Sequence, residues 1–140
     1  MFDIIVDIMK ERNSGLLRIC FVKQWPGSSV SDAAKQMGLN ADPATYQSLS
    51  SDDATSIITW ILHKDLAYGQ EIIPADRARR RALSLVQSLP SSASFYYNGN
   101  APKDLGISIG WSPATDATFD GGIIALCGEF CFGIWVEDED

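Results

Sequence analysis

The sequence predicts an α+β fold in which N-terminal helices pack on a C-terminal antiparallel sheet of three or four strands. Two observations support this prediction. Apolar residues recur at helical spacing up to about residue 89, and after Pro90 they alternate with polar residues, as in half-buried strands. Turn dipeptides such as Asn98-Gly99 separate the later apolar runs. Helices followed by a run of strands are typical of the α+β class.

The length of 140 residues fits one domain. We expect a single domain over 1–140, with a helical part over about 1–90, a β-meander over about 93–136 and an acidic tail over 137–140. Helices are predicted from amphipathic spacing and capping residues at about 2–12, 31–38, 52–68 and 75–89.

The strands follow from alternation after Pro90. We expect them at about 95–97, 105–111, 119–126 and 130–136. Residues 16–25 remain open between a strand and further helical structure, because their apolar residues match neither period cleanly.

Negative charge is concentrated near the C-terminal end. The chain holds 11 Lys and Arg against 18 Asp and Glu, a net charge of −7. No basic residue follows Lys103, whereas eight acidic residues do, so residues 104–140 carry −8 and residues 1–103 carry +1. This field disfavours nucleic-acid partners and favours a basic protein partner. The alternative is that the acidity serves only solubility.

Nothing in the sequence predicts membrane contact. Every apolar run is shorter than the ~20 residues of a membrane-spanning helix. Residues 1–7 carry acidic side chains where a signal peptide needs basic ones. We therefore expect a cytoplasmic protein whose three cysteines are reduced.

No pattern of catalytic or metal-binding residues stands out. His63 is the only histidine, and the chain has no nucleophile-elbow motif. Cys127 and Cys131 flank a predicted turn but cannot complete a zinc ligand set with one histidine; a reversible disulfide between them stays open. For Asp116 and Asp120 we favour hydrogen bonding to a loop backbone over metal binding. We predict no enzymatic activity, no metal and no cofactor.

Four segments carry a resemblance to a known group of proteins. They are His63-Lys64-Asp65-Leu66-Ala67-Tyr68 with Glu71, Phe95-Tyr96-Tyr97-Asn98-Gly99, the stretch from Gly110-Trp111-Ser112-Pro113 to Phe119-Asp120-Gly121-Gly122, and Gly133-Ile134-Trp135-Val136-Glu137-Asp138-Glu139-Asp140. Over about residues 54–140 the chain resembles small bacterial immunity proteins encoded beside polymorphic or contact-delivered toxins. The resemblance brings no catalytic residues. It implies a protein that binds one cognate toxin and blocks the toxin's active site or a neighbouring surface.

Charge and resemblance together predict a contact surface in the C-terminal part. The candidate partner-binding residues are Trp111, Asp116, Asp120, Trp135, Glu137, Asp138 and Glu139. Carboxylates would replace the phosphates of a nuclease-type toxin's substrate, and the two tryptophans would serve as anchors. We expect Trp135 to be the more exposed tryptophan of the two.

Two other function classes remain open. One is a small hydrolase or transferase that uses carboxylates, which two of Asp116, Asp120 and Glu71 converging in a deep pocket would favour. The other is an adaptor module in a larger complex. A flat acidic face with exposed aromatic side chains would favour the binding protein.

Overall fold

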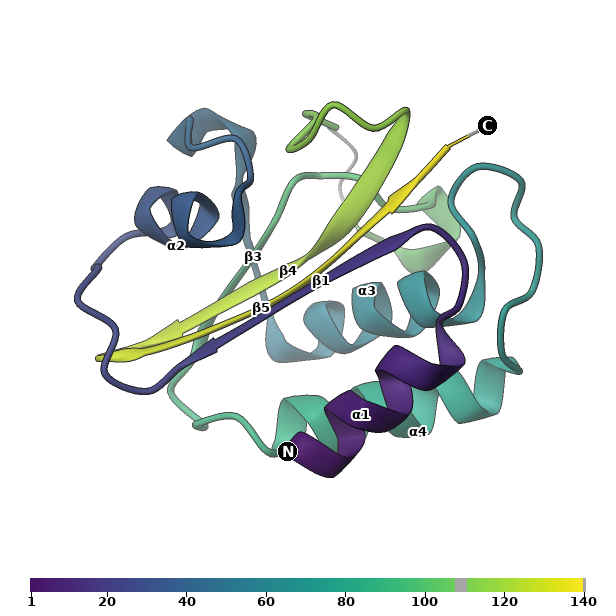
Figure 1. Ribbon diagram of the computed structural model, residues 1–140, viewed down its shortest axis with the longest axis horizontal. Helices are drawn as coiled ribbons and strands as arrows, with labels where there is room; N and C mark the ends of the chain where they lie inside the picture. The colour runs from purple at the N-terminus through teal and green to yellow at the C-terminus, as the bar shows by residue number, and fades with distance from the viewer. Residues whose placement is uncertain (108–110, 140) are drawn as a thin grey trace.

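The computed structural model, which describes residues 1–107 and 111–139, has an α+β fold (Figure 1). Five antiparallel strands form one sheet in the order β1-β5-β4-β3-β2. The helices and strands are α1 (Phe2–Glu11), β1 (Leu16–Val22), α2 (Val30–Met37), β2 (Gln47–Leu49), α3 (Ser51–His63), α4 (Ala75–Gln87), β3 (Ser94–Tyr97), β4 (Phe119–Cys127) and β5 (Phe130–Asp138), with 3₁₀ turns at Pro43–Thr45 and Lys103–Leu105.

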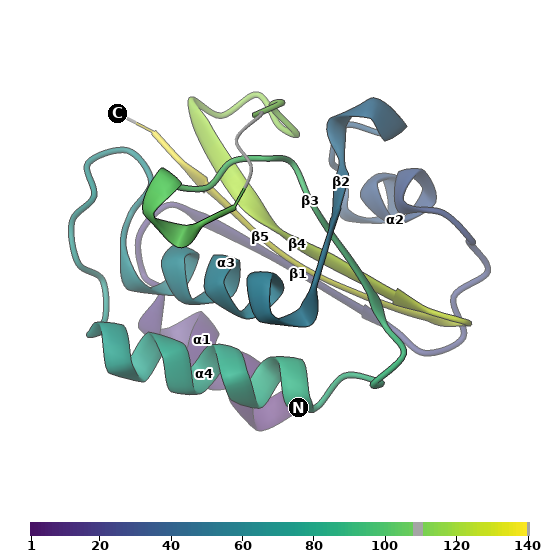
Figure 2. The ribbon, with the colours of Figure 1, turned by 180° about the vertical axis from the view of Figure 1, so that it is seen from behind.

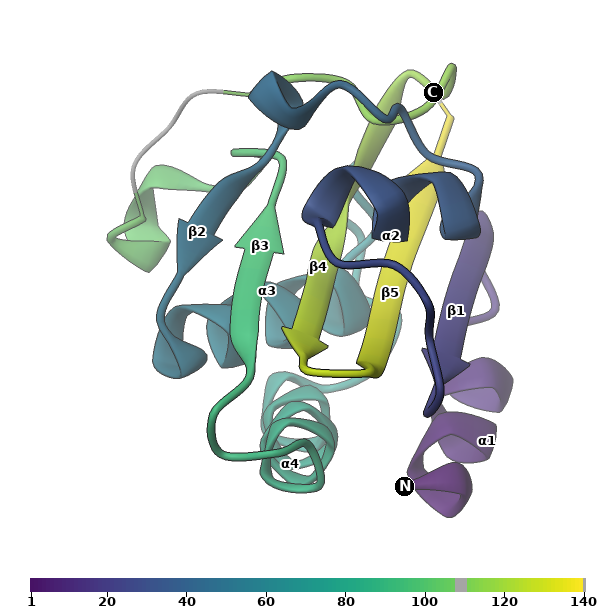
Figure 3. The ribbon, with the colours of Figure 1, turned by 90° about the vertical axis from the view of Figure 1, so that its left-hand side faces the viewer.

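The helices cover both faces of the sheet. Helices α1, α3 and α4 lie on one face, and α2 lies on the other (Figures 2 and 3). A large apolar core fills the space between the three helices and the sheet. A smaller core under α2 includes Trp25, Tyr46 and Trp135. Because both faces are covered, the central strands β4 and β5 are buried on both sides.

The predicted helices are present, and serine caps begin two of them. The Ser29 hydroxyl accepts from the Asp32 amide at 3.1 Å, and the Ser50 hydroxyl accepts from the Asp53 amide at 3.1 Å. The helix predicted over 52–68 ends at His63, however. Lys64 is extended and bridges to Glu71, which turns the chain away from helical geometry.

The sheet has five strands, not three or four, and it is not confined to the C-terminal part. Residues 16–22, which the sequence left open, form the edge strand β1, and residues 47–49, for which no strand was predicted, form β2. Helices and strands therefore alternate along the first half of the chain. The expected meander is present as β3, β4 and β5.

The strand predicted over 105–111 is wrong in the residues that the structure describes. Leu105 ends a 3₁₀ turn, and Gly106 follows in a left-handed conformation with φ of 72°, so the backbone cannot continue as a strand. Residue 111 lies outside any strand, and residues 108–110 lie outside the described residues. The acidic tail also begins later than expected, because Glu137 and Asp138 belong to β5.

Candidate functional site

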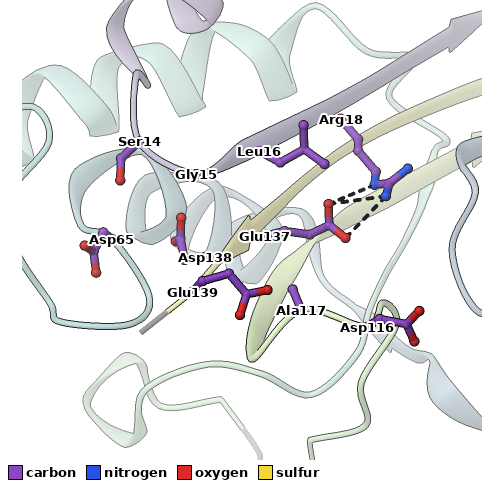
Figure 4. A pocket seen from close by; sticks show the side chains of 10 residues that line it. All are labelled: Ser14, Gly15, Leu16, Arg18, Asp65, Asp116, Ala117, Glu137, Asp138 and Glu139. Atoms are coloured by element: carbon purple, nitrogen blue, oxygen red, sulfur yellow. Dashed lines mark hydrogen bonds and ion pairs between the residues drawn. The ribbon is translucent and has the colours of Figure 1, made fainter.

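The end of the sheet where β1 begins and β5 ends carries a hollow surface. Two hollows of about 660 and 500 Å³ share Arg18, Asp116 and Glu137 in their walls. We call the two hollows together the acidic groove. The charged side chains that line it are Asp65, Asp116, Glu137, Asp138, Glu139 and Arg18 (Figure 4). Five carboxylates thus face one guanidinium, and four of them come from the residues predicted from sequence.

Glu137 and Arg18 meet across the two neighbouring strands β5 and β1. The Arg18 Nη2 atom lies 3.3 Å from both carboxylate oxygens of Glu137, and Nε donates to Oε2 at 3.3 Å. Arg18 also donates to the Met37 carbonyl at 3.3 Å, which ties the end of α2 to the groove wall. The side chains remain 34% and 12% exposed, so this pair borders solvent and is strongly screened.

Asp138 lines the groove but is held from behind by a buried arginine. Arg12 makes a two-pronged contact with its carboxylate, at 2.7 and 3.0 Å, and donates to the Ile61 carbonyl at 2.9 Å. The Leu66 amide donates to the same carboxylate at 2.8 Å. Both charged side chains are at most 3% exposed. This pair therefore fixes the end of β5 against α1 and α3.

Gly15 allows this close packing. A Cβ atom there would lie 2.1 Å from the Asp138 carboxylate and 2.3 Å from the Glu137 carbonyl. Its φ of 66° is also in the left-handed region, which favours glycine. The groove floor thus depends on a residue without a side chain.

Asp120 is buried behind the groove and holds the loop that bears Asp116. Its carboxylate accepts from the Asn98 amide group at 2.7 Å and from the Trp135 indole N–H at 3.1 Å. It also accepts from the Ala114 and Thr115 backbone amides at 3.2 Å and from the Thr115 hydroxyl at 3.1 Å. Burial raises the pKa of Asp120, and these hydrogen bonds oppose that rise. The predicted backbone-holding role is confirmed for Asp120. For Asp116 the same prediction is wrong, because its carboxylate accepts no hydrogen bond from the described residues.

The exposure predicted for Trp135 is wrong. Its ring is fully buried beneath α2 and contacts Tyr46 edge-on, whereas Trp111 is 44% exposed. Trp135 faces opposite to Ile134 as predicted, but α2 covers that second face. Trp135, Asp120 and Asp138 thus serve the packing of the folded chain and offer a partner little or no surface.

Three other carboxylates of the groove, two of them predicted from the sequence, stay available to solvent. Asp116 is exposed on its loop, and Glu139 is exposed while it accepts from the Thr118 hydroxyl at 2.5 Å. Asp65 is half-buried and accepts from the Tyr68 amide at 2.6 Å. Among the described residues, these three carboxylates form no ion pair.

Sequence reasoning missed Arg18, Asp65 and Tyr68 as parts of this surface. Tyr68 is 65% exposed and adjoins the groove through its bond to Asp65. Both Asp65 and Tyr68 lie in the first of the four segments that carry the resemblance to immunity proteins, and this resemblance could have pointed to them. Arg18 could not be predicted from the sequence, because its role depends on β1 pairing with β5.

The carboxylates considered for catalysis do not line a common hollow. Asp116 lies in the groove, Asp120 is buried behind it, and Glu71 lies 3.9 Å from His63 at the end of α3. Within residues 1–107 and 111–139 no cluster of three or more His, Cys, Asp or Glu side chains has the arrangement of a metal site. No helix in that part of the chain has the length and apolar character needed to cross a membrane.

The thiol of Cys131 interacts with a cysteine on the neighbouring strand. Cys131 hydrogen-bonds with Cys20 on β1, which lowers the pKa of Cys20 to about 7 and, together with burial, raises the pKa of Cys131. Cys127 instead lies 3.0 Å from the Ser92 hydroxyl. All three thiols are free.

Comparisons with known proteins add no relative: no family model, curated protein or solved structure matches this chain.

Proposed function

We propose that this protein is an immunity protein that binds a basic, nuclease-type bacterial toxin through the acidic groove and occludes the toxin's active site or substrate surface. The observation that carries the proposal is the gathering of Asp65, Asp116 and Glu139 around one hollow, where none of the three forms an ion pair with a described residue. These residues are far apart in the sequence, and the fold brings them to one end of the sheet.

Charge complementarity is the physical basis of the proposal. A protein that cleaves nucleic acid needs a positively charged surface for the phosphate backbone. The same surface is attracted to a cluster of carboxylates, which speeds association. A fast encounter matters for an inhibitor that must reach the toxin before the substrate does.

The groove is also pre-organised. The Arg12–Asp138 pair fixes the β5 side, and the hydrogen bonds of Asp120 fix the loop of Asp116. Carboxylates on a fixed framework lose little conformational entropy on binding. Tyr68 and Trp111 supply exposed aromatic side chains of the kind that anchor protein interfaces.

Asp116 lines the groove, whereas Asp120 is buried behind it and Glu71 lies beside His63. Of the predicted contacts, we therefore propose Asp116 and Glu139 as the exposed carboxylates that meet the toxin. Glu137 lies at the rim of the groove, beside Arg18. The proposal adds Asp65 and Tyr68. Trp111 remains a candidate anchor.

The experiment is co-expression and binding with the product of the neighbouring gene. We expect the native chain to protect cells from that product, and we expect the double variant Asp116→Asn, Glu139→Gln to lose association rate by roughly 10-fold at low salt. The matched control is Asp104→Asn, Glu129→Gln, which removes the same charge from exposed positions outside the groove. A neighbouring product that is harmless, or that the native chain does not bind, would contradict the proposal.

A further inference from the structure

The sheet face beneath α2 carries two thiols on the neighbouring strands β1 and β5 (Figure 3). Cys20 lies on β1, and Val22 points to the same face because side chains alternate along a strand. Val22 pairs with Cys131 of β5, so Cys131 also lies on this face. Both cysteines belong to the smaller core under α2. The fold thus brings together two cysteines that are far apart in the sequence.

The two thiols are in contact across the strands. Cys20 pairs directly with Gly133, which has no side chain, and Cys131 is its diagonal neighbour on the same face. The thiols of Cys20 and Cys131 form a hydrogen bond with one another. Two sulfur atoms in such contact need only a short further approach before an S–S bond can form.

The two thiols differ in exposure and in protonation. Cys20 is half-buried on the edge strand, whereas Cys131 is fully buried. Their hydrogen bond lowers the pKa of Cys20 to about 7, and the same bond and burial raise the pKa of Cys131. At neutral pH about half of Cys20 is therefore thiolate, the form that reacts with oxidants. A small oxidant reaches a reactive Cys20 first, with the protonated Cys131 behind it.

The third cysteine of the chain, Cys127, lies on the opposite face of the sheet. It pairs with Phe130, whose side chain packs on the core beneath α1, α3 and α4. Cys127 is close to Cys131 in the sequence, but the two side chains point to different faces and cannot bridge within this sheet. The Cys127 thiol instead lies 3.0 Å from the Ser92 hydroxyl. Cys127 therefore serves as a control within the same chain.

We propose that Cys20 and Cys131 form a peroxide-reactive pair, in which Cys20 is oxidised first and Cys131 then closes a disulfide with it. The Cys20 thiolate attacks one oxygen of hydrogen peroxide. An S–O bond forms, the O–O bond breaks, and the hydroxide that leaves takes up the proton that Cys20 lost on ionising. The Cys131 sulfur then attacks the sulfenic sulfur of Cys20. The S–S bond forms, the S–O bond breaks, and the leaving hydroxide takes the Cys131 proton, so that two thiols are oxidised and one peroxide is reduced to two water molecules.

The disulfide fastens the edge strand β1 to β5. Arg18, on the same strand and the same face as Cys20, lines the acidic groove, so the bond lies next to the groove wall. The bond also closes a loop that includes most of the chain, which restricts the unfolded state. We therefore expect the oxidised chain to unfold at a higher urea concentration than the reduced chain. The inference goes beyond the proposed function and does not rest on it.

The test treats the native chain with hydrogen peroxide, blocks the remaining thiols with iodoacetamide and maps the cysteines by mass spectrometry. Trypsin together with a glutamate-specific protease separates Cys127 from Cys131, because Glu129 lies between them. We expect one disulfide between the peptides of Cys20 and Cys131, which dithiothreitol reverses, and loss of the Cys20 thiol about 3-fold or more faster than loss of the Cys127 thiol. Three thiols that remain free, or a disulfide that includes Cys127, overturns the inference. Because this readout uses the native chain alone, its failure leaves binding to a toxin unaffected.

Variants separate the two steps of the reaction. In Cys131→Ala the second thiol is absent, and we expect Cys20 to stop at the sulfenic acid, which dimedone labels. In Cys20→Ala we expect Cys131 to stay unoxidised over the same time, because it is buried and protonated. The matched control Cys127→Ala should form the disulfide at the native rate. Dimedone labelling of Cys131 in Cys20→Ala, or loss of the disulfide in Cys127→Ala, overturns the assigned roles.

Discussion

The acidic residues of the C-terminal part divide into two groups with different environments. Asp120 and Asp138 are buried, and each is held by several hydrogen-bond donors or by Arg12. Asp116 and Glu139 lie on the surface a few residues away in the sequence and form no ion pair among the described residues. The C-terminal part of the chain thus supplies both the buried carboxylates that support the groove and the exposed carboxylates that give the groove its charge.

The contacts of Asp120 and Asp138 explain how the folded chain tolerates two buried carboxylates. Isolated burial of a carboxylate is costly, and donors on every side offset that cost. Neighbouring exposed carboxylates then sit on a rigid support. Two predictions separate the two groups, and a third, with a smaller expected effect, concerns the thiols.

The largest effect is expected from Arg12. Arg12→Met leaves the Asp138 carboxylate buried without its cation, and we expect the free energy of unfolding to fall by about 3–5 kcal/mol. Arg80→Met is the control, because Arg80 pairs with Asp76 on an exposed helix face and should cost at most about 0.5 kcal/mol. Urea denaturation followed by circular dichroism measures both. A loss below 1 kcal/mol for Arg12→Met would remove this pair from the framework.

An intermediate effect is expected from Asp120. Asp120→Ala strands the donors of Asn98, Trp135 and the loop backbone, and we expect a loss of about 2–3 kcal/mol in unfolding free energy. Asp116→Ala, on the same loop but exposed, should stay within about 0.5 kcal/mol of the native chain. Thermal denaturation of the two variants side by side tests this difference. Equal losses would show that the division between the groups is incorrect.

Sequence alone predicted the helices and the later strands β3, β4 and β5, but not the absence of a strand at 105–107, because periodicity and capping are local properties. Ser29 and Ser50 marked helix starts that the structure confirms. The loop-holding role of Asp120 also followed from local turn chemistry. These features need no knowledge of distant parts of the chain.

Features that depend on distant pairing were predicted incorrectly or missed. Trp135 alternates with apolar neighbours like an outward-facing residue, and only the position of α2 on the second face buries it. β1 reads as apolar on both faces because Leu17, Ile19 and Phe21 pack on the helical core while Cys20 and Val22 pack under α2. Arg18 joins the site only through the register of β1 with β5.

The smallest effect is expected for the thiols. Here the buried Cys131 lowers the pKa of the more exposed Cys20. Because the hydrogen bond with Cys131 lowers the pKa of Cys20 to about 7, alkylation of Cys20 by iodoacetamide should rise with pH, reach half its maximal rate near pH 7 and level off about one pH unit higher. In Cys131→Ala the midpoint should shift upward toward the usual value of 9.0. Mass spectrometry of the Cys20 peptide measures the rate. An unchanged midpoint in the variant would contradict the role of Cys131.

The central claim is that the exposed carboxylates of the groove attract the partner, while the buried ones only hold the groove in shape. Its most direct test is the salt dependence of the association rate with the neighbouring gene's product. We expect the rate to fall steeply with ionic strength for the native chain and for Asp104→Asn, Glu129→Gln, and only weakly for Asp116→Asn, Glu139→Gln. The same steep salt dependence in all three proteins would contradict it.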